Sequence, residues 1–414
     1  MRIDNIILRK IYDSRQEETL EAEMKNGDFA VVSSIPHGKS RGEKEAVMLP
    51  INEVLVKFEK IKSEILAKDF ISQKHFDYFL KELDNTKNKQ NLGGNLMLVL
   101  SQSFAKLMAK FKRQPLWRYL RDEFLIVNPG LEEKISVYKP PLFFFNLING
   151  GKHAPYGPNI QEYLVVPQIN DAIQSIKIVQ QFFQELKIYF LEKYNKIKYG
   201  DEGGLLIPTD DYEEPLGIYQ QISRKLNLQY KLRFSLDAAA SSFYNQKDKK
   251  YYLLRGKGLD ASALLDAYLH LINNYQIFSL EDPFEENDFN SFFRINNTIG
   301  KKTLIIGDDV TVSQVDMLAQ AIEDNIIGGI ILKPTQVGTI SEIFETAALA
   351  WREGIKIIMS HRSAETQDNF IADLCFALNC FGLKAGALNF PERMVKYERI
   401  KQIMSEEIPN LTKY

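Results

Sequence analysis

Charged side chains stand at the ends of several short apolar runs in the second half of the chain. Asp237 ends the run FSLD, Glu281 ends FSLE, and Asp308 follows LIIG. Carboxylate oxygens select a hard cation, and Mg²⁺ suits carboxylates that leave room for water and substrate oxygens. Lys333 and Lys384 follow two further apolar runs, and a lysine near a metal or another cation can act as a general base. These residues predict metal-assisted proton abstraction.

Other polar side chains add an acid and an anion site. Glu162 and Glu202 can supply the acid half of acid–base catalysis, and Gly203 and Gly204 let backbone approach a substrate closely. The adjacent pair at 362–363, Arg then Ser, forms a plausible phosphate clamp because a guanidinium matches phosphate in a forked geometry.

Each residue also has a plainer interpretation. A single acid at a strand end can cap a helix, and either lysine can simply balance the acids. His153 and His361 can hydrogen-bond a substrate or be ordinary core histidines. The glycine-rich segment 36–46 can be a mobile loop or a plain connector.

The spacing of these charges is regular. From position 237, charged positions follow at 281, 308, 333, 361 and 384, which are steps of 44, 27, 25, 28 and 23 residues by subtraction. One strand–helix unit takes about thirty residues. A charge at the carboxyl end of each strand is the pattern of a parallel α/β sheet, and in a closed barrel these ends converge on one mouth.

The N-terminal part of the chain has a different pattern of apolar and polar residues. Residues 3–35 alternate apolar and polar positions as strands do, with a hairpin turn at Asn26-Gly27, and residues 52–121 follow a helical spacing. Proline and glycine cluster between 127 and 141. We therefore expect two domains, an α+β unit at 1–130 and an α/β unit at 138–414, with a final amphipathic helix beginning near Glu392.

Composition excludes several classes of protein. The 414 residues carry a formal net charge of −2, so the composition shows no excess of basic residues that would indicate binding to nucleic acid or to an anionic membrane surface. Cys375 and Cys380 lie on one apolar stretch and fit small core residues in a reducing compartment. Five histidines without zinc-site spacing argue against zinc. With no signal peptide and no membrane span, we expect a cytoplasmic protein.

Motifs along almost the whole chain resemble those of the enolase family. They include YDSR, LDNTKNKQNLGGN, NLINGGKHA, QEYLVVP, GDEGG, SLEDPFEEND, LKPTQVGT and LKAGALNFPER. The resemblance implies a C-terminal TIM-like (β/α)₈ barrel of the enolase type and an N-terminal α+β capping domain. It implies a glycolytic and gluconeogenic reaction, the Mg²⁺-dependent, reversible dehydration of 2-phosphoglycerate to phosphoenolpyruvate, by a homodimer or higher homo-oligomer.

The resemblance also assigns roles to individual residues. Lys333 matches the base, Glu202 the acid with support from Glu162, and Lys384 a group that stabilises the enolate. Substrate contacts match the set His153, Gln161, His361, Arg362 and Ser363. Asp237, Glu281 and Asp308 match the ligands of one Mg²⁺. Ser40 matches the ligand of a second, substrate-dependent Mg²⁺, on a loop that would close as a lid.

The chain departs from the family pattern around these positions. Lys39 and Arg41 flank Ser40 in place of small residues, and Thr335 stands where asparagine is usual. Two alternatives to an active enolase are a related enzyme acting on a sugar acid or muconate, and a catalytically idle binding or scaffold protein. The phosphate pair at 362–363 argues against the first, and the presence of Glu202, Lys333 and Lys384 argues against the second.

Overall fold

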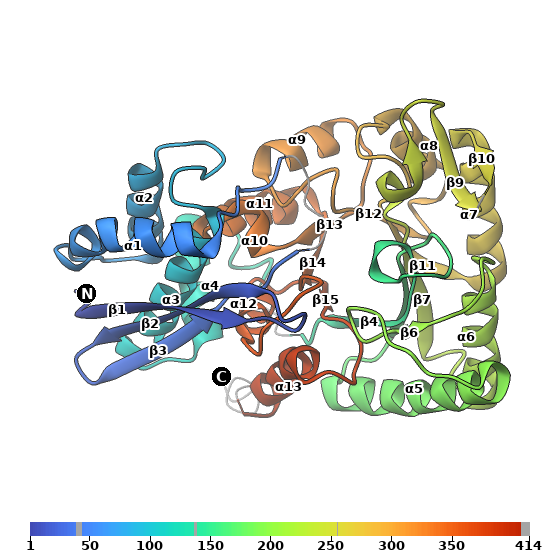
Figure 1. The fold of residues 1–414 in the computed structure, drawn as a ribbon, viewed down its shortest axis with the longest axis horizontal. Coiled ribbons are helices and arrows are strands. Elements are labelled where there is room, and N and C mark those ends of the chain that lie inside the picture. The colour runs from blue at the N-terminus through green and yellow to red at the C-terminus, as the bar shows by residue number, and fades with distance from the viewer. Residues whose placement is uncertain (39–43, 136–138, 255, 407–414) are drawn as a thin grey trace.

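In the computed structural model of the chain, residues 1–38, 44–135, 139–254 and 256–406 are described. The first part contains a three-stranded antiparallel sheet and four helices, on the left of Figure 1. Their bounds are β1 (Asn5–Tyr12), β2 (Glu18–Asn26), β3 (Phe29–Ser34), α1 (Ile51–Leu66), α2 (Gln73–Asp84), α3 (Gly94–Phe111) and α4 (Leu116–Val127). The strand and helix patterns predicted for this region are confirmed.

The β2–β3 hairpin turns at the predicted place, with a small shift. Asn26 pairs with Phe29, so the two loop residues are Gly27 and Asp28 rather than Asn26 and Gly27. Gly27 has a φ of 53°, a conformation that glycine adopts without a Cβ penalty. The sheet then lies against α3, whose side chains are buried along nearly its whole length.

The rest of the chain forms a closed barrel of eight strands. Neighbouring strands in the ring are β4 (Leu142–Asn149), β5 (Glu162–Pro167), β7 (Leu232–Asp237), β11 (Ile277–Glu281), β12 (Leu304–Gly307), β13 (Gly329–Leu332), β14 (Lys356–Ser360) and β15 (Gly382–Lys384). The ring closes because β15 pairs with β4. Apolar residues from β4, β5, β12, β13 and β14 form a cluster of their own, which we interpret as the filling of the barrel.

One strand contradicts the expectation of a fully parallel sheet. β5 runs antiparallel to both of its neighbours, β4 and β7. Between β4 and β5 there is a single 3₁₀ turn, η1 (Gly151–His153), and no crossover helix. A parallel pair needs a long crossover, whereas a short connection returns the chain in the opposite direction.

Helices cover the outside of the barrel, as Figure 1 shows. They are α5 (Ala172–Tyr194), α6 (Glu214–Lys225), α7 (Ala261–Tyr275), α8 (Phe289–Ile299), α9 (Val315–Glu323), α10 (Pro334–Val337), α11 (Ile340–Glu353), α12 (Phe370–Ala377) and α13 (Pro391–Glu406). Short additional strands are β6 (Leu205–Leu206), β8 (Tyr244–Asn245), β9 (Lys250–Leu254) and β10 (Lys257–Leu259), and a second 3₁₀ turn is η2 (Ala240–Phe243). Among the described residues, no helix combines the length and apolar character needed to cross a bilayer.

Several helices begin at a side-chain cap that the sequence makes visible. Asp171 and Asp260 accept backbone N–H groups at the starts of α5 and α7. Thr339 caps α11 by accepting the Glu342 backbone N–H, and its hydroxyl donates to the Glu342 carboxylate at 2.7 Å. Because α11 follows Lys333 and α10 directly, this cap fixes where the chain turns after that lysine.

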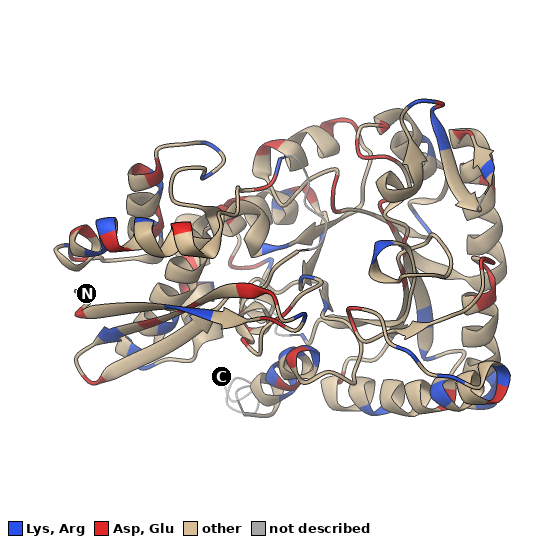
Figure 2. Ribbon diagram, viewed as in Figure 1, with Lys and Arg blue, Asp and Glu red and all other residues tan. Residues whose placement is uncertain are grey.

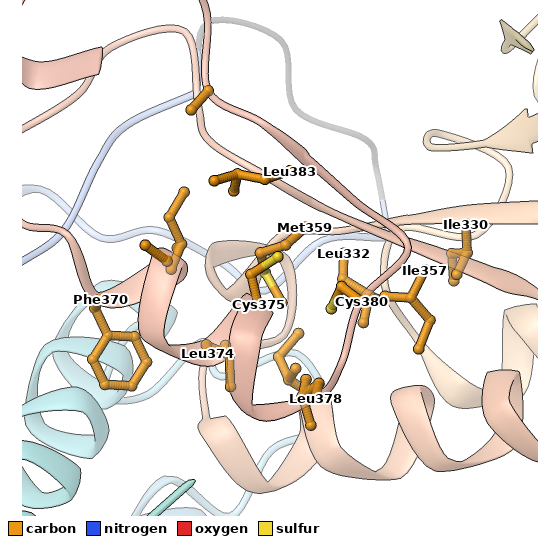
Figure 3. Packing of buried hydrophobic residues seen from close by; sticks show 14 of the residues in the cluster. Ile330, Leu332, Ile357, Met359, Phe370, Leu374, Cys375, Leu378, Cys380 and Leu383 are labelled. Atoms are coloured by element: carbon orange, nitrogen blue, oxygen red, sulfur yellow. The ribbon is translucent and has the colours of Figure 1, made fainter. Parts of the chain in front are cut away.

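The two cysteines behave as small core residues, as predicted. Both are buried free thiols, on α12 and directly after it. Figure 3 shows them among apolar side chains that include Leu332, Met359 and Leu374.

Contacts between α4 and α12 join the N-terminal part to the barrel. Arg121, which is buried, donates from Nε to the Ala377 carbonyl at 2.9 Å and from Nη2 to the Phe376 carbonyl at 2.9 Å. These carbonyls end α12 and carry the partial negative charge of a helix C-terminus. The proposed boundary between 130 and 138 stays a prediction, and residues 136–138 lie outside the described ranges.

Arg121→Met should lower the free energy of unfolding by roughly 2–4 kcal/mol, because it leaves buried carbonyls without their donor. The measurement is urea unfolding followed by far-ultraviolet circular dichroism. Arg224→Met, at an exposed position of α6, is the matched control and should change little. Equal stability of the two variants would contradict the importance of this contact.

Candidate active site

The predicted acids and lysines meet at one end of the barrel. Asp237, Glu281 and Lys384 are the last residues of β7, β11 and β15. Asp308 and Lys333 directly follow β12 and β13. Glu281 pairs in register with Asp237, so neighbouring strands bring their charges to the same level. The convergence predicted from the spacing is therefore present in the structure.

Glu162 reaches this mouth by a different route. It is the first residue of β5, not the last, and it pairs with Asp237 on β7 and with Asn149 on β4. Because β5 runs antiparallel, its N-terminal end lies beside the C-terminal ends of its neighbours. Gln161, one residue earlier, donates from its backbone N to the Asp237 carbonyl at 3.0 Å.

The ammonium of Lys384 lies among three carboxylates. Its Nζ is 2.8 Å from both oxygens of Glu281, 3.2 Å from Asp237 Oδ2 and 3.1 Å from Glu162 Oε2. All four side chains are buried. The interpretation of Lys384 as a counter-charge is thus confirmed for the structure described.

Burial and charge act in opposite directions on these groups. Burial alone would lower the pKa of Lys384, but the surrounding Glu162, Glu281 and Asp237 raise it well above its ordinary value. Burial raises the pKa of the Glu281 carboxyl, and the neighbouring Asp237 raises it further. Burial and mutual repulsion therefore oppose ionisation of these acids, and the ammonium of Lys384 favours it.

Lys333 pairs with the Asp308 carboxylate. Burial acts to lower the Lys333 pKa, and the paired Asp308 outweighs it, so the net direction is upward. Ser313 and Gln336 hold this pair in place: Ser313 Oγ accepts from the Lys333 backbone N at 2.9 Å, and Gln336 Nε2 donates to Asp308 Oδ1 at 3.2 Å.

A second buried group surrounds Glu202. Asn146 Nδ2 donates to Glu202 Oε2 at 2.9 Å, while Glu202 Oε1 lies 3.4 Å from His361 Nε2 and 3.6 Å from His153 Nδ1. Burial raises the pKa of Glu162, and the charge of Glu202 raises it further. Although burial opposes ionisation of Glu202 as well, the two histidines hold its pKa well below the ordinary value. The pKa values of these two neighbouring carboxyls are thus shifted in opposite directions, upward for Glu162 and downward for Glu202.

Arg362 contacts a residue from the N-terminal part of the chain. Its Nη1 donates to Glu45 Oε2 at 3.0 Å and its Nη2 to Glu45 Oε1 at 3.4 Å. Thr335 Oγ1, at the position that departs from the family pattern, accepts from Arg362 Nη1 at 3.1 Å. The substituted threonine thus keeps a polar contact with the guanidinium.

These residues line one cavity of about 40 Å³. Of the predicted site residues, those that line it are His153, Gln161, Glu162, Glu202, Asp237, Asp308, Lys333, His361, Arg362, Ser363 and Lys384. Glu281 does not line it and contacts Lys384 instead. Ser40, Lys39 and Arg41 lie outside the described residues. Figure 2 shows acidic and basic segments interspersed over the ribbon in this view.

The donor set fits a divalent cation. Asp237, Glu281 and Asp308 offer only carboxylate oxygens, and each contacts a lysine ammonium, so each faces positive charge. Their oxygens do not all lie within 4.8 Å of one another. Within the described ranges, two other groups do: His153 with Glu162 and Glu202, and Asp282 with Asp308 and Asp309. Asp282 already accepts the backbone N–H groups of residues 308 and 309, at 2.9 and 2.8 Å.

Comparison with known proteins agrees with this geometry. The family model "Enolase, C-terminal TIM barrel domain" matches residues 137–414, and "Enolase, N-terminal domain" matches residues 3–120. The chain belongs to the enolase family. It is 36% identical to an enolase of Methanocaldococcus jannaschii, over 100% of this chain and 96% of that protein. It is 34% identical to an enolase of Thermococcus kodakarensis, over 100% of this chain and 96% of that protein. It is 33% identical to an enolase of Campylobacter jejuni, over 98% of this chain and 97% of that protein.

Sequence reasoning missed four polar residues that hold the enolase-type site together: Glu45, Asn146, Gln336 and Arg393. Arg393 carried a detectable signal. It lies on the stripe of α13 that also contains Tyr397 and Ile400, all fully buried, where an apolar residue is expected. A charge on such a stripe indicates a buried polar partner. Glu45, Asn146 and Gln336 contact residues distant in sequence, and no local pattern reveals those contacts.

Lys384→Met should lower the free energy of unfolding by about 3–5 kcal/mol at neutral pH with chelator present, because it leaves three buried carboxylates without their shared counter-charge. Chemical unfolding measures this. Lys301→Met, at an exposed position before β12, is the control. A Lys384→Met protein as stable as the control would mean that these carboxyls are neutral rather than paired.

Proposed function

We propose that the protein catalyses the reversible dehydration of 2-phosphoglycerate to phosphoenolpyruvate. The observation that carries the proposal is the placement of a candidate base and a candidate acid around one cavity. Lys333 follows β13 and Glu162 begins β5, and these strands stand four places apart in the ring of eight. A molecule in the cavity would thus meet a base on one side and an acid on the other, as loss of a proton and a hydroxyl from adjacent carbons requires.

In the proposed reaction Lys333 must first lose the proton that its contact with Asp308 favours. Its neutral amine then takes the proton from carbon 2 and becomes an ammonium. The electron pair left behind forms the double bond to carbon 3, and the carbon-3 hydroxyl leaves as water with a proton from the acid pair. Glu202 lies next to Glu162 in this pair, so a proton held between them has a short path to either oxygen. Both hydrogens of the product water are then accounted for.

Positive groups at the cavity would hold the two anionic ends of the substrate. We assign the phosphate to Arg362 and Ser363, with the guanidinium exchanging its contact with Glu45 for the phosphate. Lys384 would lie beside the substrate carboxylate, where negative charge grows as carbon 2 loses its proton. His153, His361 and Gln161 would hydrogen-bond the remaining polar atoms.

A divalent cation is implied by the family, and we propose Mg²⁺ held by Asp237, Glu281 and Asp308, with Ser40 assigned to a second ion. Such a cation would neutralise these carboxylates and stabilise the negative charge that develops on the substrate carboxylate. The position of these three carboxyl groups at the same end of neighbouring strands supports this assignment. The homodimer, the glycolytic role and the cytoplasmic location stay predictions.

The first test is the ultraviolet absorbance of phosphoenolpyruvate forming from 2-phosphoglycerate. Product should appear with Mg²⁺ and stop when chelator is added, because the carboxylates then lack their divalent counter-charge. Product in chelator would remove the metal from the proposal. A folded protein that binds Mg²⁺ yet makes no product would favour the idle binding protein instead.

Lys333→Ala should lower kcat by about a thousandfold or more, because no other group takes the carbon-2 proton. Folding and Mg²⁺ binding, followed by circular dichroism and calorimetry, should persist. Lys301→Ala, far from the cavity, should keep full activity. Retained turnover in Lys333→Ala would mean that the base is another residue.

A further inference from the structure

Arg393 has no role in the proposal so far, yet its side chain is fully buried beside the site. It projects from the first turn of α13. Its Nη1 lies 2.6 Å from His361 Nδ1 and donates to the Arg362 carbonyl at 2.7 Å. Its Nη2 donates to the Ser363 carbonyl at 2.7 Å and to the Asp201 carbonyl at 3.1 Å. One guanidinium therefore contacts both segments that carry His361 and Glu202.

The contact with His361 fixes the direction of a hydrogen bond. A guanidinium has donors and no acceptor, so His361 Nδ1 must accept and cannot carry a hydrogen. A neutral imidazole with a bare Nδ1 carries its hydrogen on Nε2. Nε2 is the nitrogen 3.4 Å from Glu202 Oε1, and it has no hydrogen-bond partner among the described residues. We propose that Arg393 is a positioning residue that fixes His361 as the neutral Nε2–H tautomer, which leaves this N–H free to donate to the substrate beside the Glu202 carboxylate.

The charged groups around the ring support a neutral His361. Burial and, to a smaller extent, the positive charge of Arg393 lower its pKa to about 4 and outweigh the upward effects of Glu202 and Glu365. An imidazolium would also place a hydrogen on Nδ1 against the guanidinium. His361 therefore acts as a hydrogen-bond donor of fixed direction, and the moving proton is left to the Glu162–Glu202 pair.

The backbone at Gly386 leaves the space that this arrangement needs. A Cβ built there would lie 3.0 Å from Arg393 Cδ and 3.1 Å from His361 Cε1, and the residue has a φ of 85°. Any side chain at this position would press on both members of the pair. The close approach of arginine and histidine thus depends on a glycine of the LKAG motif.

The direct test is nuclear magnetic resonance of the protein labelled with ¹⁵N-histidine, without substrate. The chain has five histidines, and His361→Gln identifies the His361 signals by their loss. The expected result is an unprotonated Nδ1 and a protonated Nε2 from pH 6 to 8. A protonated Nδ1 in the unmutated protein would overturn the inference without any Arg393 variant.

Arg393→Met should release the tautomer to a mixture and lower kcat by roughly ten- to a hundredfold, because the N–H is no longer aimed. Arg393→Lys keeps a positive donor and should restore the tautomer and part of kcat. Arg399→Met, on the same helix as Arg393, is the control: it removes an ion pair with Asp373 of α12 and should leave the His361 signals unchanged. Unchanged His361 signals in Arg393→Met would overturn the assignment.

The His361 resonance signals and kcat test different claims. The effect on kcat rests on the proposed function, whereas the tautomer does not. The tautomer is measured on the free protein, so a protein that makes no phosphoenolpyruvate still tests it. Conversely, an active enzyme with normal His361 signals in Arg393→Met would leave the reaction intact and reject only the positioning role.

Discussion

The ammonium of Lys384 is the interaction on which the mouth of the barrel depends. Carboxylates from β5, β7 and β11 lie within 3.2 Å of it. Buried charges are costly unless they are paired and hydrogen-bonded, so the acids can crowd together only around a positive centre. One ammonium is shared by three acids, and the same acids offer the carboxylate oxygens of the proposed divalent-cation site.

The reversed strand β5 makes this arrangement geometrically possible. A parallel β5 would bring the C-terminal end of the strand, Pro167, to the mouth and carry Glu162 to the far end. The short connection after β4 does more than reverse direction. It also supplies His153, which joins Glu162 and Glu202 in one buried group. The connection between β4 and β5 therefore places both His153 and Glu162 beside Glu202.

The sequence predicts the position of a site residue best where that residue directly follows a strand pattern. Asp237, Glu281, Asp308, Lys333 and Lys384 each follow an apolar run, so strand periodicity alone placed them at strand ends, and regular spacing placed those ends together. Glu162 also lies at the mouth, but the reversed direction of its strand is not visible in the sequence, because the strand pattern of EYLVVP does not record direction. Strand direction depends on the connection, and a loop with several Gly and Pro residues does not specify it.

The contact between Glu45 and Arg362 joins residues 317 positions apart. Since the guanidinium already has a carboxylate partner, a phosphate bound there as proposed would replace one anion by another. The free energy of binding at this position is then the difference between two ion pairs, which is much smaller than the energy of either. An anion that matches the guanidinium geometry no better than a carboxylate does would gain almost no binding free energy by displacing Glu45. Glu45 would therefore favour anions that pair with the guanidinium better than a carboxylate does.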